Sequence, residues 1–225
     1  GRFGFPAMGI EGAAIVSVAV NILSFLLLTA YIQLQPEMRR YELFVRFWRP
    51  DWPAFREVVQ LGLPIGFTML AEVSLFTGAS LLMGRIGTLE LAAHGIALQL
   101  ASIAFMIPLG LAQAGTVRVG VAHGRGDHLG IVRASWAVLV AAAIIAVGGG
   151  LLFALIPTTL ASVFLDEAGK DSAAVLAIAG PFVVIAGIFQ LVDGLQAIAA
   201  GLLRGLKDTR VPMVLALISY WPIGF

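Results

Sequence analysis

The chain has 225 residues, of which 60% are hydrophobic and only 12% charged, and its mean hydropathy is +0.97. Because soluble domains carry about 25% charged residues, this composition excludes a single water-exposed domain and predicts a membrane protein. A net charge of +1 argues against a nucleic-acid partner, and the absence of cysteine excludes disulfides and thiolate metal sites.

Five apolar stretches are each long enough to cross a hydrocarbon core about 30 Å thick as a helix. Backbone groups in lipid find partners only within a helix or a closed barrel, and these runs lack the alternation of a barrel. We therefore expect an all-α polytopic transmembrane helix bundle with five full spans and a truncated sixth. The spans cover residues 13–33, 57–84, 89–121, 131–156 and 173–203, and the sixth begins near Val211.

The long connection over residues 36–53 is the most polar stretch of the chain, and its apolar side chains alternate with Arg and Glu. This pattern predicts a short amphipathic helix along the membrane interface, and a linker between two helical units. The chain starts without Met and stops at Phe225 inside an apolar run, so we also expect it to be a piece of a longer protein.

Positive charge alternates between successive connections. The connections after the first, third and fifth spans hold eleven of the fourteen Lys and Arg residues. By the positive-inside rule, these basic loops should face the cytoplasm, which predicts a multi-pass protein of the inner cell membrane. We interpret the basic clusters as topogenic charge with snorkelling side chains rather than as lipid-specific sites.

Two acids fall well inside apolar spans. Glu72 lies about 22 Å along a helix from Glu57, and Asp193 about 16 Å from Arg204, so both fit within the membrane at similar depths. An ionisable group there costs at least about 2.5–3.5 kcal/mol on insertion scales. Such an acid can hold a proton until a cation displaces it, which predicts a proton- or sodium-coupled site. The alternative is that both acids only bond neighbouring helices.

Amides accompany these acids. Gln190, Asp193 and Gln196 follow at intervals of three residues, which predicts one polar face of a helix and the wall of an aqueous cavity. Gln99 and Gln113 are further candidates for a substrate cavity, although each stands isolated in its span. Interhelical hydrogen bonding alone would also explain all four amides.

Prolines interrupt three spans. Pro64, Pro108 and Pro181 each free a backbone carbonyl, and such breaks near a buried charge are typical of transporters that bend their helices. His94 lies one turn inside the end of its span, where a hydrogen-bonded interfacial histidine is favoured over a proton relay.

Several motifs occur in a fixed order along the chain. They are LGLP at residues 61–64, AEVSLF at 71–76, LVDGLQ at 191–196 and GLLRGLKDT at 201–209. On these motifs the chain resembles the multidrug and toxic compound extrusion (MATE) family over nearly its whole length, most specifically over residues 193–209.

This resemblance implies a twelve-helix transporter with two six-helix lobes and a cavity between them. Residues 1–35 would be the last helix of the first lobe, 36–56 the cytoplasmic linker, and 57–225 most of the second lobe. The remainder of the first lobe would be a partner within the same protein, and the present stretch alone should not transport.

The activity implied is that of a cation-coupled antiporter, not an enzyme, which exports small organic and often cationic compounds against an inward H⁺ or Na⁺ gradient. Glu72 and Asp193 would be its cation-coupling acids and the ligands of any Na⁺, and the resemblance implies no cofactor beyond the transported ion. Some sodium-coupled members carry Tyr one turn before the aspartate, where this chain has Phe189.

Three other functions remain open. A lipid-linked sugar flippase of the same superfamily should line its cavity with cations, whereas no Lys or Arg lies deep in a span here. An intramembrane hydrolase needs two acids sharing a water molecule, together with acidic motifs that this chain lacks. In a structural membrane subunit, Glu72 and Asp193 would only hold helices together.

Overall fold

The computed structural model of the chain describes residues 9–39, 48, 50–165 and 171–224. Its internal contacts divide into two compact units, Gly1–Phe55 and Arg56–Phe225. Every regular element in the described residues is a helix, which confirms the predicted all-α fold.

The first unit contains one long helix, α1 (Gly9–Leu34), and the short helix α2 (Pro36–Arg39). No residue of α1 is buried, and its apolar side chains are exposed on all sides. Polar side chains in α1 bond to the helix itself, since Asn21 Nδ2 donates to the Ser17 carbonyl oxygen at 2.8 Å. In the stretch predicted as an amphipathic helix, α2 covers residues 36–39, and most of the remainder lies outside the described residues, so the helix stays a prediction.

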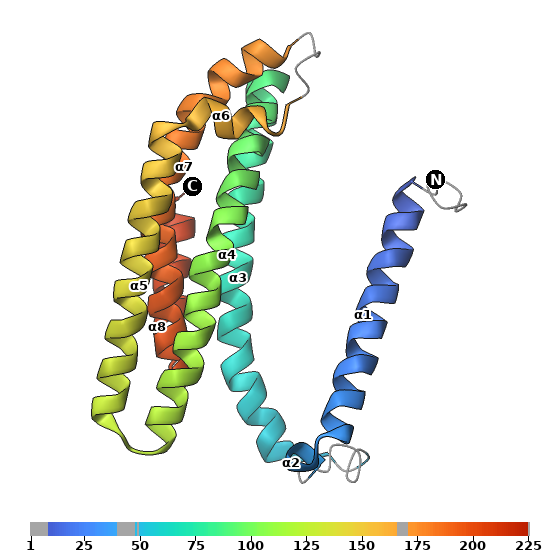
Figure 1. The fold of residues 1–225 in the computed structure, drawn as a ribbon, viewed down its shortest axis with the longest axis vertical. Coiled ribbons are helices and arrows are strands. Elements are labelled where there is room, and N and C mark those ends of the chain that lie inside the picture. Colours follow the sequence, from blue (N-terminus) through green and yellow to red (C-terminus); the bar gives the residue numbers. More distant parts are fainter. Residues whose placement is uncertain (1–8, 40–47, 49, 166–170, 225) are drawn as a thin grey trace. The chain divides into compact units, whose positions relative to one another are not determined.

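In the second unit, long helices alternate in direction, and a short helix joins two of them (Figure 1). The order is α3 (Trp52–Ile86), α4 (Thr88–Gly124), α5 (His128–Leu155), α6 (Pro157–Ser162), α7 (Ser172–Gly205), α8 (Arg210–Ile218) and the π-helix η2 (Ser219–Ile223).

Helices α4, α5 and α7 form the packed core of this unit, with α7 against both of the others. Two glycines let α7 approach α4 closely. A Cβ at Gly201 would lie 2.7 Å from the carbonyl oxygen of Ala112, and one at Gly205 would lie 2.7 Å from that of Thr116. Thr116 Oγ1 also donates a hydrogen bond to the carbonyl oxygen of Gly201 at 2.7 Å. Small residues and interhelical hydrogen bonds thus hold these helices together, as in other membrane bundles.

Helix α3 packs through side chains against the C-terminal part of the unit. Ala71 is fully buried and forms a small cluster with Ala216 of α8 and Tyr220 of η2. Beside this cluster, Trp221 Nε1 donates a hydrogen bond to Ser74 Oγ at 3.0 Å. The cluster turns the Ala71 side of α3 towards α8 and η2.

The predicted spans are confirmed as helices. In the described residues, five helices (α1, α3, α4, α5 and α7) are long and apolar enough to cross a membrane, and α8 with η2 forms a shorter apolar segment. The short helix α6 was not predicted. It starts at Pro157, where the predicted fourth span ended, because proline is favoured at the first position of a helix.

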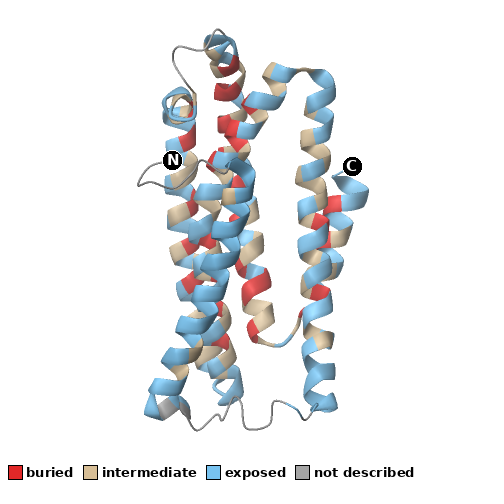
Figure 2. Ribbon diagram, turned by 90° about the vertical axis from the view of Figure 1, so that its right-hand side faces the viewer, coloured by how far each residue is buried: buried red, intermediate tan, exposed pale blue. Residues whose placement is uncertain are grey.

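The surface of the bundle is largely apolar. Figure 2 shows buried positions limited to narrow stripes along the helices, with exposed positions over most of the remaining surface. Large side chains such as Leu81 and Ile144 are 69% and 68% exposed. Because soluble proteins rarely expose continuous apolar patches of this kind, lipid or further protein must cover these faces.

Candidate functional site

Both acids found inside apolar spans line a single cavity of the second unit. The cavity has a volume of about 280 Å³ and includes Glu72 of α3 and Asp193 of α7. Both side chains are half-buried, and their carboxylates interact electrostatically. Helix α4 joins α3 and α7 in forming the rest of the cavity wall. This wall is mostly apolar and consists of Phe76, Leu98, Ala101, Ser102, Phe105, Met106 and Phe189.

Neighbouring residues turn each acid towards this cavity. Successive residues of a helix are about 100° apart, so the burial of Ala71 against α8 and η2 directs the adjacent Glu72 to a different side of α3. On α7, a Cβ at Gly194 would lie 3.2 Å from Pro108 Cγ, so this glycine marks the close contact with α4. Asp193 therefore lies beside the α4–α7 contact, on the side of α7 that faces the cavity shared with Glu72 of α3.

Tyr220 is a polar neighbour of the acids that the sequence reasoning missed. It is only 6% exposed, and its hydroxyl accepts a hydrogen bond from Gln196 Nε2 at 2.6 Å. It lies close enough to Glu72 and Asp193 for their charges to act on its hydroxyl. The sequence did offer a signal for this residue, namely a phenolic hydroxyl inside an apolar segment. Buried tyrosines usually find a hydrogen-bond partner, so Tyr220 could have been expected to bond to a polar side chain.

The amides do not form one wall. Gln190 is 4% exposed and faces α5, where its Nε2 would lie 3.0 Å from a Cβ at Gly149. Each step of three residues turns a helix by about 300°, so Gln190 and Gln196 are about 120° apart, with Asp193 between them. Gln99 and Gln113 are exposed, and neither is among the residues that line the cavity of the two acids.

The three span prolines lie inside helices that continue past them. Pro64 and Pro108 are buried, whereas Pro181 is exposed. Thr68 Oγ1 donates to the carbonyl oxygen of Pro64 at 2.9 Å, a local bond that can bend a helix. Their role as hinges stays a prediction.

A second cavity of about 400 Å³ lies between the same three helices and contains His94. Phe76 and Phe189 line both cavities, and their rings meet edge to face with centroids 5.9 Å apart. Contrary to the expected hydrogen-bonded histidine, His94 Nε2 is buried without a hydrogen-bond partner among the described residues. The reason is its apolar surroundings, which include Phe182 at a centroid distance of 6.4 Å.

The chemistry of the first cavity is that of two carboxylates and few other polar groups. In the described part of the chain, no three His, Cys, Asp or Glu side chains come together as a metal site. Glu72, Asp193 and the hydroxyl of Ser102 offer oxygen atoms of the kind that hard cations prefer. The two acids can therefore exchange protons or share one cation, whereas a full coordination shell would need water or further ligands.

These features define a polytopic α-helical membrane protein with a pair of acids on a cavity inside its bundle. Comparison with known families agrees, because the MatE family model matches residues 64–225. The chain belongs to the MatE family, which confirms the resemblance found in its motifs.

Known relatives resemble the chain over its full length. It is 67% identical to the "Probable multidrug resistance protein NorM" of Rhizobium meliloti, over 100% of the chain and 48% of the relative. Proteins of the same name from Agrobacterium fabrum and Xylella fastidiosa are 65% and 42% identical, again over 100% of this chain and over 48% and 47% of their own lengths. The chain thus spans about half the length of the curated relatives it matches.

Proposed function

We propose that the protein carrying this chain is a multidrug efflux transporter, and not an enzyme, that exchanges H⁺ or Na⁺ for small organic compounds at Glu72 and Asp193. The observation that carries the proposal is the shared cavity of these two acids. Support comes from membership of the MatE family and from relatives named as probable multidrug resistance proteins.

The proposed coupling follows from the electrostatics of the cavity. Two ionised carboxylates beside apolar walls repel each other and have lost much of their hydration, so the pair favours binding a proton or a cation. Neutralising the pair removes that repulsion and would favour a different packing of α3 against α7. Release of the proton or cation on the other side of the membrane would then reset the transporter.

The remaining parts of the proposal concern the whole protein. Residues 1–35 would end the first lobe, 36–56 would form the linker and 57–225 the second lobe, with the organic substrate held between lobes. The basic connections would face the cytoplasm, in a protein of the inner cell membrane. An organic cation is the favoured substrate, because it would be attracted by the same carboxylates that bind the coupling ion.

The test is transport by the full-length protein in lipid vesicles. We expect an imposed H⁺ or Na⁺ gradient to drive a fluorescent organic cation across the membrane, and Asp193→Asn to lower this flux to that of protein-free vesicles. The substitution keeps the shape of the side chain but removes its titratable charge. Glu11→Gln provides a matched control, since Glu11 is an exposed acid at the start of α1.

Two outcomes would contradict the proposal. One is dye movement by Asp193→Asn at the wild-type rate under the same gradient. The other is dye movement that depends on neither gradient. A sugar flippase would instead move a lipid-linked pyrophosphate, and a hydrolase would release a chemically altered product.

A further inference from the structure

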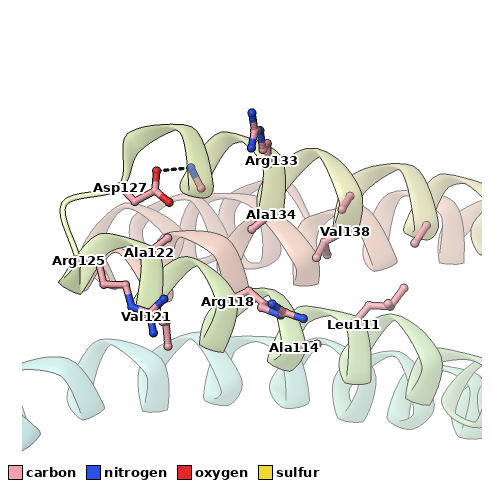
Figure 3. Close-up of a pocket in the computed structure, with 13 residues that line it drawn as sticks. Leu111, Ala114, Arg118, Val121, Ala122, Arg125, Asp127, Arg133, Ala134 and Val138 are labelled. Carbon is pink, nitrogen blue, oxygen red and sulfur yellow. Dashed lines mark hydrogen bonds between the residues drawn. The ribbon is translucent and has the colours of Figure 1, made fainter.

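A groove of about 560 Å³ runs between α4 and α5 at their connected ends, remote in the sequence from Glu72 and Asp193 (Figure 3). Three arginines line it near the loop, and small apolar side chains line it further along the helices. We call it the α4–α5 groove. The residues used below are Arg118, Arg125 and Arg133, and Ala134, Ala137 and Ala141.

The arginines present free positive charge. All three side chains are exposed, and none has an ion pair or hydrogen bond within the described parts of the chain. Figure 3 shows Arg118 and Arg125 on α4, two helical turns apart, and Arg133 on α5. A charge cluster that only set topology would not require an adjoining groove.

The acid at this end is already engaged. Asp127 accepts a hydrogen bond from the backbone N–H of Gly130 at 2.8 Å and so caps the start of α5. The lining of the groove therefore carries three guanidinium groups and one carboxylate, which caps a helix N-terminus. This charge balance attracts an anion and repels the organic cations proposed as substrates.

The groove extends about 21 Å along α4, from Arg125 to Leu111, and about 16 Å along α5, from Gly130 to Ala141. Its apolar part, beyond Arg118 and Arg133, covers about 10 to 12 Å of each helix and so fits within one membrane leaflet. Half of a hydrocarbon core about 30 Å thick is about 15 Å. Trp136 of α5 is 64% exposed one turn beyond Arg133, as expected near a membrane interface.

From this combination we infer that the α4–α5 groove binds an anionic phospholipid, with the phosphate on Arg118 and Arg125 and one acyl chain along the alanines of α5. A zwitterionic lipid would bring a cationic group towards the arginines, and a free phosphate would leave the apolar part of the groove unfilled. Basic pockets between membrane helices are known sites for anionic headgroups. The basic cluster would then serve more than topology.

The test uses native mass spectrometry of the full-length protein with phosphatidylglycerol or phosphatidylcholine of identical acyl chains. We expect the wild type to retain one phosphatidylglycerol preferentially. Arg118→Gln with Arg125→Gln should lower that preference by about thirtyfold, on the order of fivefold per arginine. Arg56→Gln with Arg210→Gln removes two exposed charges elsewhere and should leave the preference unchanged.

A second pair of variants tests the acyl chain without changing charge. Ala137→Phe should fill the α4–α5 groove and reduce lipid retention, whereas Ala143→Phe, at an exposed position of α5 outside the groove, should not. If both pairs of arginine substitutions lowered the preference for phosphatidylglycerol equally, general surface charge would explain the binding. That result would overturn the inference. Equally effective competition by inorganic phosphate, or a wild-type protein that retains no lipid, would overturn it as well.

Discussion

Glu72 and Asp193 place two ionisable side chains among apolar walls, where insertion of one acid costs at least about 2.5–3.5 kcal/mol. Tyr220 lies near both acids, and its side chain differs from theirs in having a hydrogen bond within the described residues, from Gln196. Because Gln196 belongs to α7, this hydroxyl links η2 to the helix that carries Asp193.

Replacing Tyr220 with Phe should lower the free energy of unfolding by about 0.5–1.5 kcal/mol, the usual net worth of one hydrogen bond. The ring and its packing on Ala71 would remain, but Gln196 Nε2 would lose its acceptor. Denaturant titration of the purified full-length protein measures the change. Tyr31→Phe is a suitable control because Tyr31 is 53% exposed on α1, and an equal loss in both variants would contradict the assigned hydrogen bond.

At the scale of elements, α7 organises the second unit through its glycine positions. Gly194 faces Pro108, Gly201 faces Ala112 and Gly205 faces the backbone of Thr116. Lipid provides little hydrophobic drive between helices, so close backbone contact and the Thr116 hydrogen bond stabilise the α4–α7 pair. The same contact sets the position of Asp193 relative to α4.

Gly201→Ala should therefore destabilise the protein by about 1–3 kcal/mol, the typical effect of adding a methyl group to a well-packed site. The new Cβ would lie 2.7 Å from a backbone oxygen that cannot rotate away. Gly110→Ala on α4 is the matched control, since no atom beyond its own stretch of helix lies within 4 Å of the added Cβ. Thermal unfolding in detergent compares the two, and a tolerated Gly201→Ala would argue against this close approach.

For the second unit as a whole, the alternation of long helices brings the basic α4–α5 and α7–α8 connections to the end where α3 begins (Figure 1). Lys207 Nζ lies 2.7 Å from Glu57 Oε1 at this end. Both side chains are more than half exposed, so water and salt screen the pair and it contributes little to stability. Packing, rather than this ion pair, must hold α3 in place.

The proposed orientation predicts which connections a membrane-impermeant thiol reagent can reach in intact cells. These 225 residues contain no cysteine, so a single cysteine introduced among them reports its own position once any cysteine elsewhere in the full-length protein is replaced by serine. Thr88→Cys, at the start of α4, should react from outside, whereas His128→Cys at the start of α5 and Arg210→Cys at the start of α8 should react only after permeabilisation. The reverse pattern would contradict the assignment of the basic connections to the cytoplasm.

The sequence by itself determined the class of protein, the helical spans and the two acids worth examining. Long apolar runs can satisfy their backbone only as helices in lipid, and an ionisable residue inside such a run is conspicuous because of its energetic cost. The tertiary structure decided which side chains share a surface. It turned Gln190 towards α5, left His94 Nε2 without a partner among the described residues, and brought Tyr220 to the acids from a distant segment. Periodicity fixes angles around one helix, whereas the rotation of each helix against its neighbours depends on contacts such as Ala71 with Tyr220 and Gly201 with Ala112.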